Sequence, residues 1–192
     1  MTPSRLRLLS MAAIIATAGL AALSWSQTWY RLQLADSEHP IGGDVAGGAL
    51  LPLALASLCV VLALGLAGAV FRAILAVLDS LLGVCVIVVT AWSLSDPVRA
   101  SVPALVNATG FSGDADVFRD QVTSSVVTIW PWVGLVAGVL MTLTGLAIAV
   151  TGRGWPLSGS RYTRTRTASP DSDPVRDWDA LSEGDDPTAG PR

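Results

Sequence analysis

The sequence predicts an all-α membrane protein in which four transmembrane helices form an up-down bundle, and three observations lead to this prediction. Hydrophobic residues make up 52% of the chain and charged residues only 14%, a composition typical of membrane proteins. Several long intervals carry no charge or a single one, and each is long enough to cross a hydrocarbon core of ~30 Å. The intervals are continuously apolar, without the period-two alternation of barrel strands, so we expect helices.

Four segments are predicted to span the membrane, and with their loops they form one domain over residues 1–152. The predicted spans are residues 8–25, 49–71, 73–92 and 129–150. Because the second and third spans follow each other so closely, a tight hairpin around Arg72 is expected.

The first span has two interpretations. Arg5 and Arg7 followed by an apolar run resemble a cleaved signal peptide. Retention of the span is favoured, because Trp25 and Trp29 lie where interfacial anchors would hold a mature helix.

The distribution of arginines orients the spans. On the opposite side from the termini, the loops hold only Arg31, Arg99 and Arg119 among several acidic residues. The other basic residues near the spans fall on the side of the termini: Arg5, Arg7, Arg72, Arg153, Arg161, Arg164 and Arg166. By the positive-inside rule, we expect a multi-pass membrane protein with both termini in the cytoplasm. The chain contains no Lys and uses Ala, Gly, Val and Asp heavily, which indicates a GC-rich bacterial genome, so the expected membrane is a bacterial plasma membrane.

The two outer loops are expected to be mostly irregular. Residues 27–48 have a glycine-rich exit and no strong periodic element. Residues 93–125 begin with Asp96 and Pro97, an N-cap and first-turn pair that favours a short surface helix. The glycines between 110 and 113 would end that helix.

Residues 153–192 are rich in Ser, Thr, Arg, Asp and Pro, so they are predicted to form a disordered cytoplasmic tail. Trp178 and Leu181 stand three positions apart in an acidic setting. This pair is a candidate docking element for a cytoplasmic partner.

Tryptophan placement is the most informative local feature. Five of the seven tryptophans are predicted to lie at the outer membrane surface: Trp25, Trp29, Trp92, Trp130 and Trp132. One interpretation is an aromatic belt at headgroup depth, which amphipathic indoles favour. The other is an aromatic vestibule for a flat apolar ligand.

Asp79 is the only charged residue inside a predicted span, ~10 Å from the cytoplasmic hairpin. An ionised carboxylate at the centre of a helix costs ~2.5–3.5 kcal/mol on insertion, so it normally faces a partner or water. Gly65 is predicted to lie at the same depth, which would leave a pocket beside the carboxylate. In a functional role, Asp79 would relay a proton or bind a cation. In a structural role, it would be a protonated hydrogen-bond donor or would pair with Arg72 or Arg7.

Small and apolar residues in the spans are expected to pack inside the bundle. Cys59 and Cys85 are predicted core residues without a redox or metal role. Two helix faces carry small residues that permit close approach of helices. They are Gly134, Gly138, Thr142, Gly145 and Ala149 in the fourth span, and Ala12, Ala16, Gly19 and Ser26 in and after the first.

The sequence contains no phosphate loop, zinc-ligand spacing, nucleophile elbow or basic-aromatic nucleic-acid patch. We therefore expect no enzyme activity, no metal or cofactor and no nucleic-acid partner. The expected partners are the lipid bilayer, a second copy or another membrane protein.

Four motifs in order give the chain a resemblance to a known family. They are Ser26-Gln27-Thr28-Trp29, Trp130-Pro131-Trp132, Gly152-Arg153-Gly154-Trp155-Pro156 and Trp178-Asp179-Ala180-Leu181. The chain resembles the actinobacterial tryptophan-associated transmembrane proteins, whose genes lie among tryptophan-biosynthesis genes. The resemblance implies a role connected with tryptophan and carries over no catalytic residue.

Two functions remain open at this point. The chain would handle tryptophan or an indole compound, by transport or sensing, through the outer tryptophans and Asp79. Alternatively, it would be a non-catalytic membrane scaffold whose acidic tail docks a cytoplasmic partner.

Overall fold

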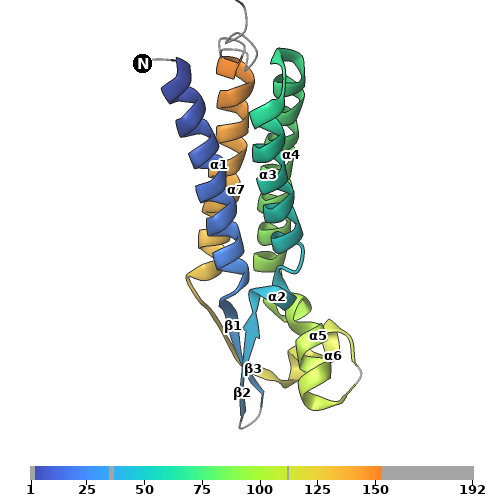
Figure 1. Ribbon diagram of the computed structural model, residues 1–192. Coiled ribbons are helices and arrows are strands. Elements are labelled where there is room, and N and C mark those ends of the chain that lie inside the picture. The colour runs from blue at the N-terminus through green and yellow to red at the C-terminus, as the bar shows by residue number, and fades with distance from the viewer. Residues whose placement is uncertain (1–2, 35–36, 112, 153–192) are drawn as a thin grey trace, which may run out of the picture. The chain divides into compact units, whose positions relative to one another are not determined.

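Four long helices lie side by side in the structure, a computed structural model that describes residues 3–34, 37–111 and 113–152. They are α1 (Pro3–Trp25), α3 (Leu50–Leu66), α4 (Ala69–Ser95) and α7 (Trp130–Thr151), and successive long helices run in opposite directions (Figure 1). By length and composition, α1, α4 and α7 are able to cross a membrane, whereas α3 is a shorter apolar helix. The predicted up-down order of the helices is therefore present.

The inward face of each helix follows a coiled-coil spacing. On α4 the buried positions alternate in steps of three and four residues: Arg72, Ala76, Asp79, Gly83, Val86, Thr90 and Ser93. The buried residues of α7 repeat in the same way, from Pro131 through Gly134, Gly138, Met141 and Gly145 to Ile148. Such spacing keeps one seam of a helix turned toward its neighbours along its whole length.

Glycines bring α4 and α7 into direct contact. A Cβ atom at Gly145 would lie 2.7 Å from the Ala76 carbonyl oxygen and 2.5 Å from the Ser80 Oγ. A Cβ atom at Gly83 would likewise lie 2.5 Å from the Thr142 backbone nitrogen. The small-residue face predicted for the fourth span thus packs inside the bundle, as expected.

Two arginines hold the turn that joins α3 to α4. Arg7 on α1 donates a hydrogen bond to the Gly65 carbonyl at 2.8 Å, and Arg72 on α4 donates to the Ala67 carbonyl at 3.2 Å. Arg72 also donates to the Gly152 carbonyl at 2.8 Å. The last carbonyls of α3 and α7, which have no partner within their own helices, are satisfied in this way.

The prediction of a tight hairpin around Arg72 is wrong in its position. The helix α3 ends at Leu66, and residues 69–71, assigned to the second span, belong to α4. Arg72 is 2% exposed inside α4. A guanidinium can stay buried there because it donates to the carbonyl oxygens of Ala67 and Gly152.

The all-α prediction is also wrong, because a small sheet follows the first helix. The strands β1 (Thr28–Leu34), β2 (Ser37–Gly42) and β3 (Val122–Val127) pair antiparallel in the order β2-β1-β3. Buried residues of β1, among them Trp29, Tyr30 and Leu32, form a hydrophobic cluster with Leu105 and Phe118. Residues 28–34 and 37–42 of the predicted first loop therefore form strands.

Three short helices complete this end of the molecule: α2 (Gly43–Ala46), α5 (Pro97–Thr109) and α6 (Ala115–Gln121). We call the sheet and these helices the head. The predicted helix start is confirmed, since the Asp96 carboxylate accepts a hydrogen bond from the Arg99 backbone N–H. Gly110 ends α5 in a left-handed conformation with φ of 66°.

Two packing predictions for the spans are wrong. Cys59 and Cys85 are exposed rather than in the core. On α1 the residues Ala12, Ala16 and Gly19 are exposed, while Ile14, Thr17 and Ala18 face the bundle. Small size permits close approach but does not say which face of a helix is used. The predicted tail, with Trp178 and Leu181, lies outside the described residues.

We expect Gly145→Ala to destabilise the bundle by ~1–3 kcal/mol, because the new methyl group would overlap the α4 backbone. The matched control is Gly19→Ala on α1, where nothing lies within 4 Å of the new atom. Equilibrium unfolding in mixed detergent micelles, followed by circular dichroism, measures both. Equal stability of the two variants would contradict the close contact of α4 and α7.

Candidate functional site

The five tryptophans predicted at the outer surface divide into two groups. Trp29 is fully buried in the head cluster, with Trp25 and Trp130 packed against it. The Trp29 Nε1 donates to the Ser24 carbonyl at 2.8 Å, so this ring fastens the head to the end of α1. Trp92 and Trp132 are instead 66% and 54% exposed. Of these five tryptophans, Trp92 and Trp132 are the ones with large exposed surfaces.

Trp92 lies at a hollow where the end of α4 meets the head, which we call the junction pocket. Its volume is about 300 Å³. The lining residues are Ala46, Val89, Trp92, Ser93, Asp96, Arg99 and Ala100. The walls are mostly apolar, and Asp96 and Arg99 supply the charges. Trp132 does not line this pocket.

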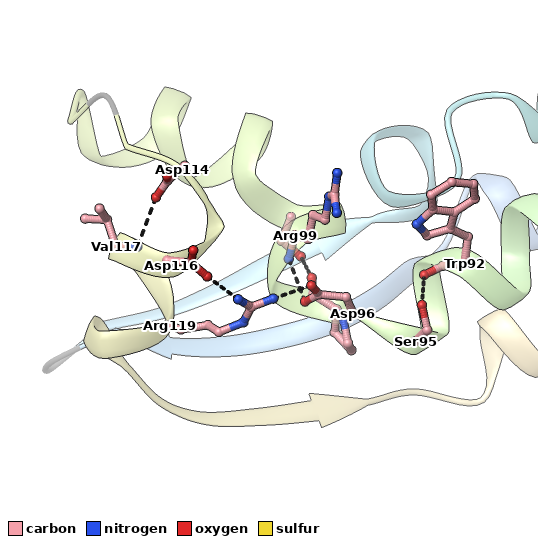
Figure 2. Close-up of polar contacts among 10 residues, drawn as sticks. Trp92, Ser95, Asp96, Arg99, Asp114, Asp116, Val117 and Arg119 are labelled. Atoms are coloured by element: carbon pink, nitrogen blue, oxygen red, sulfur yellow. Dashed lines mark hydrogen bonds and ion pairs between the residues drawn. The ribbon is translucent and has the colours of Figure 1, made fainter.

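The pocket forms because the chain changes direction between α4 and α5. The helix α4 ends at Ser95, Asp96 caps the next helix, and Pro97 begins α5. Trp92 and Arg99 flank this break on successive helices. In Figure 2 the Trp92 ring and the Arg99 side chain project to the same side of the ribbon.

An ion-pair chain borders the pocket. Arg119 on α6 contacts the carboxylates of both Asp96 and Asp116 (Figure 2). These ion pairs connect the start of α5 to α6, and the Asp96 carboxylate is therefore already paired with Arg119. Within the described residues, Arg99 forms no ion pair.

A hydrogen bond between Tyr30 and Ser93 holds a residue that lines the pocket in place. The Tyr30 hydroxyl lies 2.8 Å from the Ser93 Oγ, and both residues are buried. Burial raises the pKa of the Tyr30 hydroxyl above its ordinary value, and the hydrogen bond to Ser93 offsets part of this rise. The contact ties β1 to α4 at a residue that lines the pocket.

Asp79 lies inside the bundle with a different partner from the expected ones. The Ser57 hydroxyl on α3 donates to the Asp79 Oδ1 at 2.6 Å, and both side chains are fully buried. Gly65, predicted beside Asp79, instead accepts a hydrogen bond from Arg7 at the end of α3. The Asp79 Oδ2 has no hydrogen-bond partner in the described part of the chain. The hydrogen bond between Ser57 and Asp79 thus connects α3 to α4.

The sequence analysis did not predict that Asp96 and Arg99 line a pocket. For Asp96 the sequence held a clue, because its capping motif with Pro97 marks the end of one helix and the start of the next, four residues after Trp92. For Arg99 it held none, since an isolated arginine in a loop is usually solvated. In the described residues, no group of three His, Cys, Asp or Glu side chains is arranged to hold a metal ion.

The bundle and its head define the class of the protein: an apolar helical membrane protein with a small mixed domain at one end of the helices. Comparison with known proteins then gives the family. A family model described as tryptophan-associated transmembrane protein matches residues 9–188, and the chain belongs to this family. No curated protein and no solved structure matches the chain.

We expect Ser57→Ala to destabilise the bundle by ~1–3 kcal/mol, because it leaves Asp79 buried without that hydrogen bond. Asp79→Asn should cost less, since the amide oxygen still accepts from Ser57. Thr144→Ala, which removes only a helix-local hydrogen bond, serves as the control. Unfolding in mixed micelles measures all three, and a Ser57→Ala variant as stable as Thr144→Ala would contradict this connection between α3 and α4.

Proposed function

We propose that this chain is a multi-pass plasma-membrane protein, without enzyme activity, that recognises tryptophan or a related indole compound at the outer membrane surface. The observation that carries the proposal is the junction pocket, with the exposed Trp92 ring on its wall. Family membership supplies the connection to tryptophan. The length of α3 and the distribution of arginines support the membrane arrangement, and the lining of the pocket supports the ligand.

The arrangement requires α3 to be a fourth span. Its 17 residues would extend ~25 Å, at the lower limit for crossing a bilayer. The helix begins with Leu50, whose side chain lies close to Gly134 near the head. It ends where Arg7 and Arg72 meet the carbonyls of residues 65 and 67. The helix α3 therefore covers most of the depth of its three neighbours.

The charge distribution supports a head on the outer side. Arg5, Arg7 and Arg72 lie at the end of the bundle opposite the head. The head holds three arginines, of which Arg31 and Arg119 pair with acidic residues. Under the positive-inside rule, the end that carries Arg5, Arg7 and Arg72 faces the cytoplasm.

The pocket fits a flat aromatic ligand of modest size. Its volume of about 300 Å³ lies at the lower end of the range for small-molecule sites. Val89, Ala46 and Ala100 provide apolar walls, and the Trp92 ring provides a face on which an indole can stack. An aromatic pair of this kind contributes ~0.5–1.5 kcal/mol beyond its burial.

Recognition at the surface is better supported than passage through one copy. The seam between α4 and α7 is closed by backbone contacts at Gly83 and Gly145. Asp79, an ionisable residue in the middle of the bundle, accepts a hydrogen bond from Ser57. The scaffold alternative depends on Trp178 and Leu181, which the structure does not describe.

The topology predicts opposite accessibility for two single cysteines placed in a background with Cys59→Ser and Cys85→Ser. In intact cells, a membrane-impermeant maleimide should label His39→Cys in the head but not Gly68→Cys in the α3–α4 turn. Gly68 is exposed, with nothing within 4 Å of an added Cβ, so permeabilised cells should label both. Labelling of Gly68→Cys in intact cells would contradict four spans with cytoplasmic termini.

For ligand binding, we expect Trp92→Leu to weaken the affinity for tryptophan by about tenfold, in line with the loss of a stacked aromatic pair. Trp132→Leu is the matched control, because Trp132 is similarly exposed but lies outside the pocket. Binding of radiolabelled tryptophan to protein in lipid nanodiscs measures the effect.

Two results would overturn the binding proposal. One is the absence of saturable binding of tryptophan and of simple indoles to the wild-type protein. The other is binding that Trp92→Leu and Trp132→Leu affect equally, which is the behaviour expected of an aromatic belt.

A further inference from the structure

We propose that the junction pocket selects aromatic carboxylates, with Arg99 holding the carboxylate of the ligand and the amino group of an amino acid contributing little. This inference rests on the proposed function and names the chemical class of ligand for the same site. Arg31 and Arg119 of the head form ion pairs, whereas Arg99 forms none within the described residues.

The cationic groups of the head differ in their pairing. The Arg31 guanidinium lies 3.7 Å from the Glu38 carboxylate, and Arg119 contacts Asp96 and Asp116. Arg99 lines the pocket, is exposed, and has no acidic partner within the described residues. Its guanidinium is therefore the positive charge of the pocket that is available to a ligand.

The acidic group of the pocket is already engaged. The Asp96 Oδ1 accepts from the Arg99 backbone N–H at 3.1 Å, and the Oδ2 accepts from the Arg119 guanidinium. A ligand ammonium would have to compete with Arg119 for this carboxylate. Arg119 also lowers the local negative potential, so attraction of a cation to the pocket is weak.

The acids on the other side of Arg99 are engaged as well. Asp114 and Asp116 line a second hollow together with Arg99 and Arg119. The Asp114 carboxylate accepts from the Val117 backbone N–H at 3.2 Å, and Asp116 pairs with Arg119. Neither carboxylate forms an ion pair with Arg99 that would hold its side chain away from the junction pocket.

The geometry matches a ligand with a ring and an acid at opposite ends. Trp92 and Arg99 line the same hollow from α4 and α5, together with apolar side chains. A guanidinium presents a planar fork that pairs with both oxygens of a carboxylate. A ring stacked on Trp92 can thus direct its acidic side chain to Arg99.

Three indole ligands separate the possible contributions. L-tryptophan carries a carboxylate and an ammonium, indole-3-propionate only the carboxylate, and tryptamine only the ammonium. Isothermal titration calorimetry on the full-length protein in nanodiscs, with protein-free nanodiscs as the blank, measures each affinity. We expect L-tryptophan and indole-3-propionate to bind within a few-fold of each other, and tryptamine to bind at least about tenfold more weakly.

A variant of Arg99 tests the assigned residue. Arg99→Gln should weaken both carboxylate ligands by roughly ten- to hundredfold, which is the usual effect of losing a charge-assisted hydrogen bond. Binding of tryptamine should be unchanged or stronger, because a repelling charge is removed. Arg31→Gln removes one exposed arginine of the same head outside the pocket and should leave all three affinities unchanged.

Each outcome decides one of the two proposals. If tryptamine binds as tightly as indole-3-propionate, or if Arg99→Gln and Arg31→Gln have equal effects, the carboxylate inference is wrong and the indole pocket stands. If wild-type protein binds none of the three ligands, the proposed function itself is wrong. Because Arg99 contributes its backbone N–H, not its side chain, to the cap of α5, the variant should retain the fold.

Discussion

The close contact between α4 and α7 is the constraint on which the rest of the structure depends. Lipid gives helices little hydrophobic reason to associate, so backbone proximity and hydrogen bonds must hold them. Glycines at 83, 138 and 145 allow that proximity, and the Ser80 hydroxyl donates to the Thr142 carbonyl at 3.2 Å across the seam. Since α4 is continuous over 27 residues, fixing residues 76–87 against α7 also fixes the position of Trp92 near its end.

The polar residues on the inward face of α4 give this contact its register. Arg72 meets carbonyls from the ends of α3 and α7, Asp79 meets Ser57, and Ser93 meets Tyr30. A shift of α4 along its axis would break these bonds together and leave several polar groups buried without partners, at ~1–3 kcal/mol each. The same interactions therefore position the bundle, the head and the wall of the junction pocket.

Sequence reasoning recovered what depends on local pattern and missed what depends on distant pairing. Charge-free length located the helices, and the glycine face of α7 was identified correctly. The sheet was missed because β1 pairs with β3, which follows about ninety residues later, and the alternation of apolar and polar residues in β1 covers only residues 30–34. Arg72 was placed in a turn because charges usually avoid helix interiors, whereas here the carbonyls of Ala67 and Gly152, at the ends of two neighbouring helices, accept hydrogen bonds from it.

The tryptophans show why residue type alone did not define the site. Trp29 follows α1 and Trp92 lies in the last turn of α4, yet one is a fully buried core residue and the other is 66% exposed beside a pocket. The difference lies in what covers each ring: the chain at Gly43 and Gly47 packs against the Trp29 ring, whereas the chain turns away from Trp92 at Asp96 and Pro97. A break at the end of a span would lie at headgroup depth, where an indole carboxylate places its ring toward the lipid and its charge toward water. A pocket that combines a stacking ring with an unpaired guanidinium at that depth requires little reorientation of such a ligand, and this favours recognition of molecules gathered at the membrane surface.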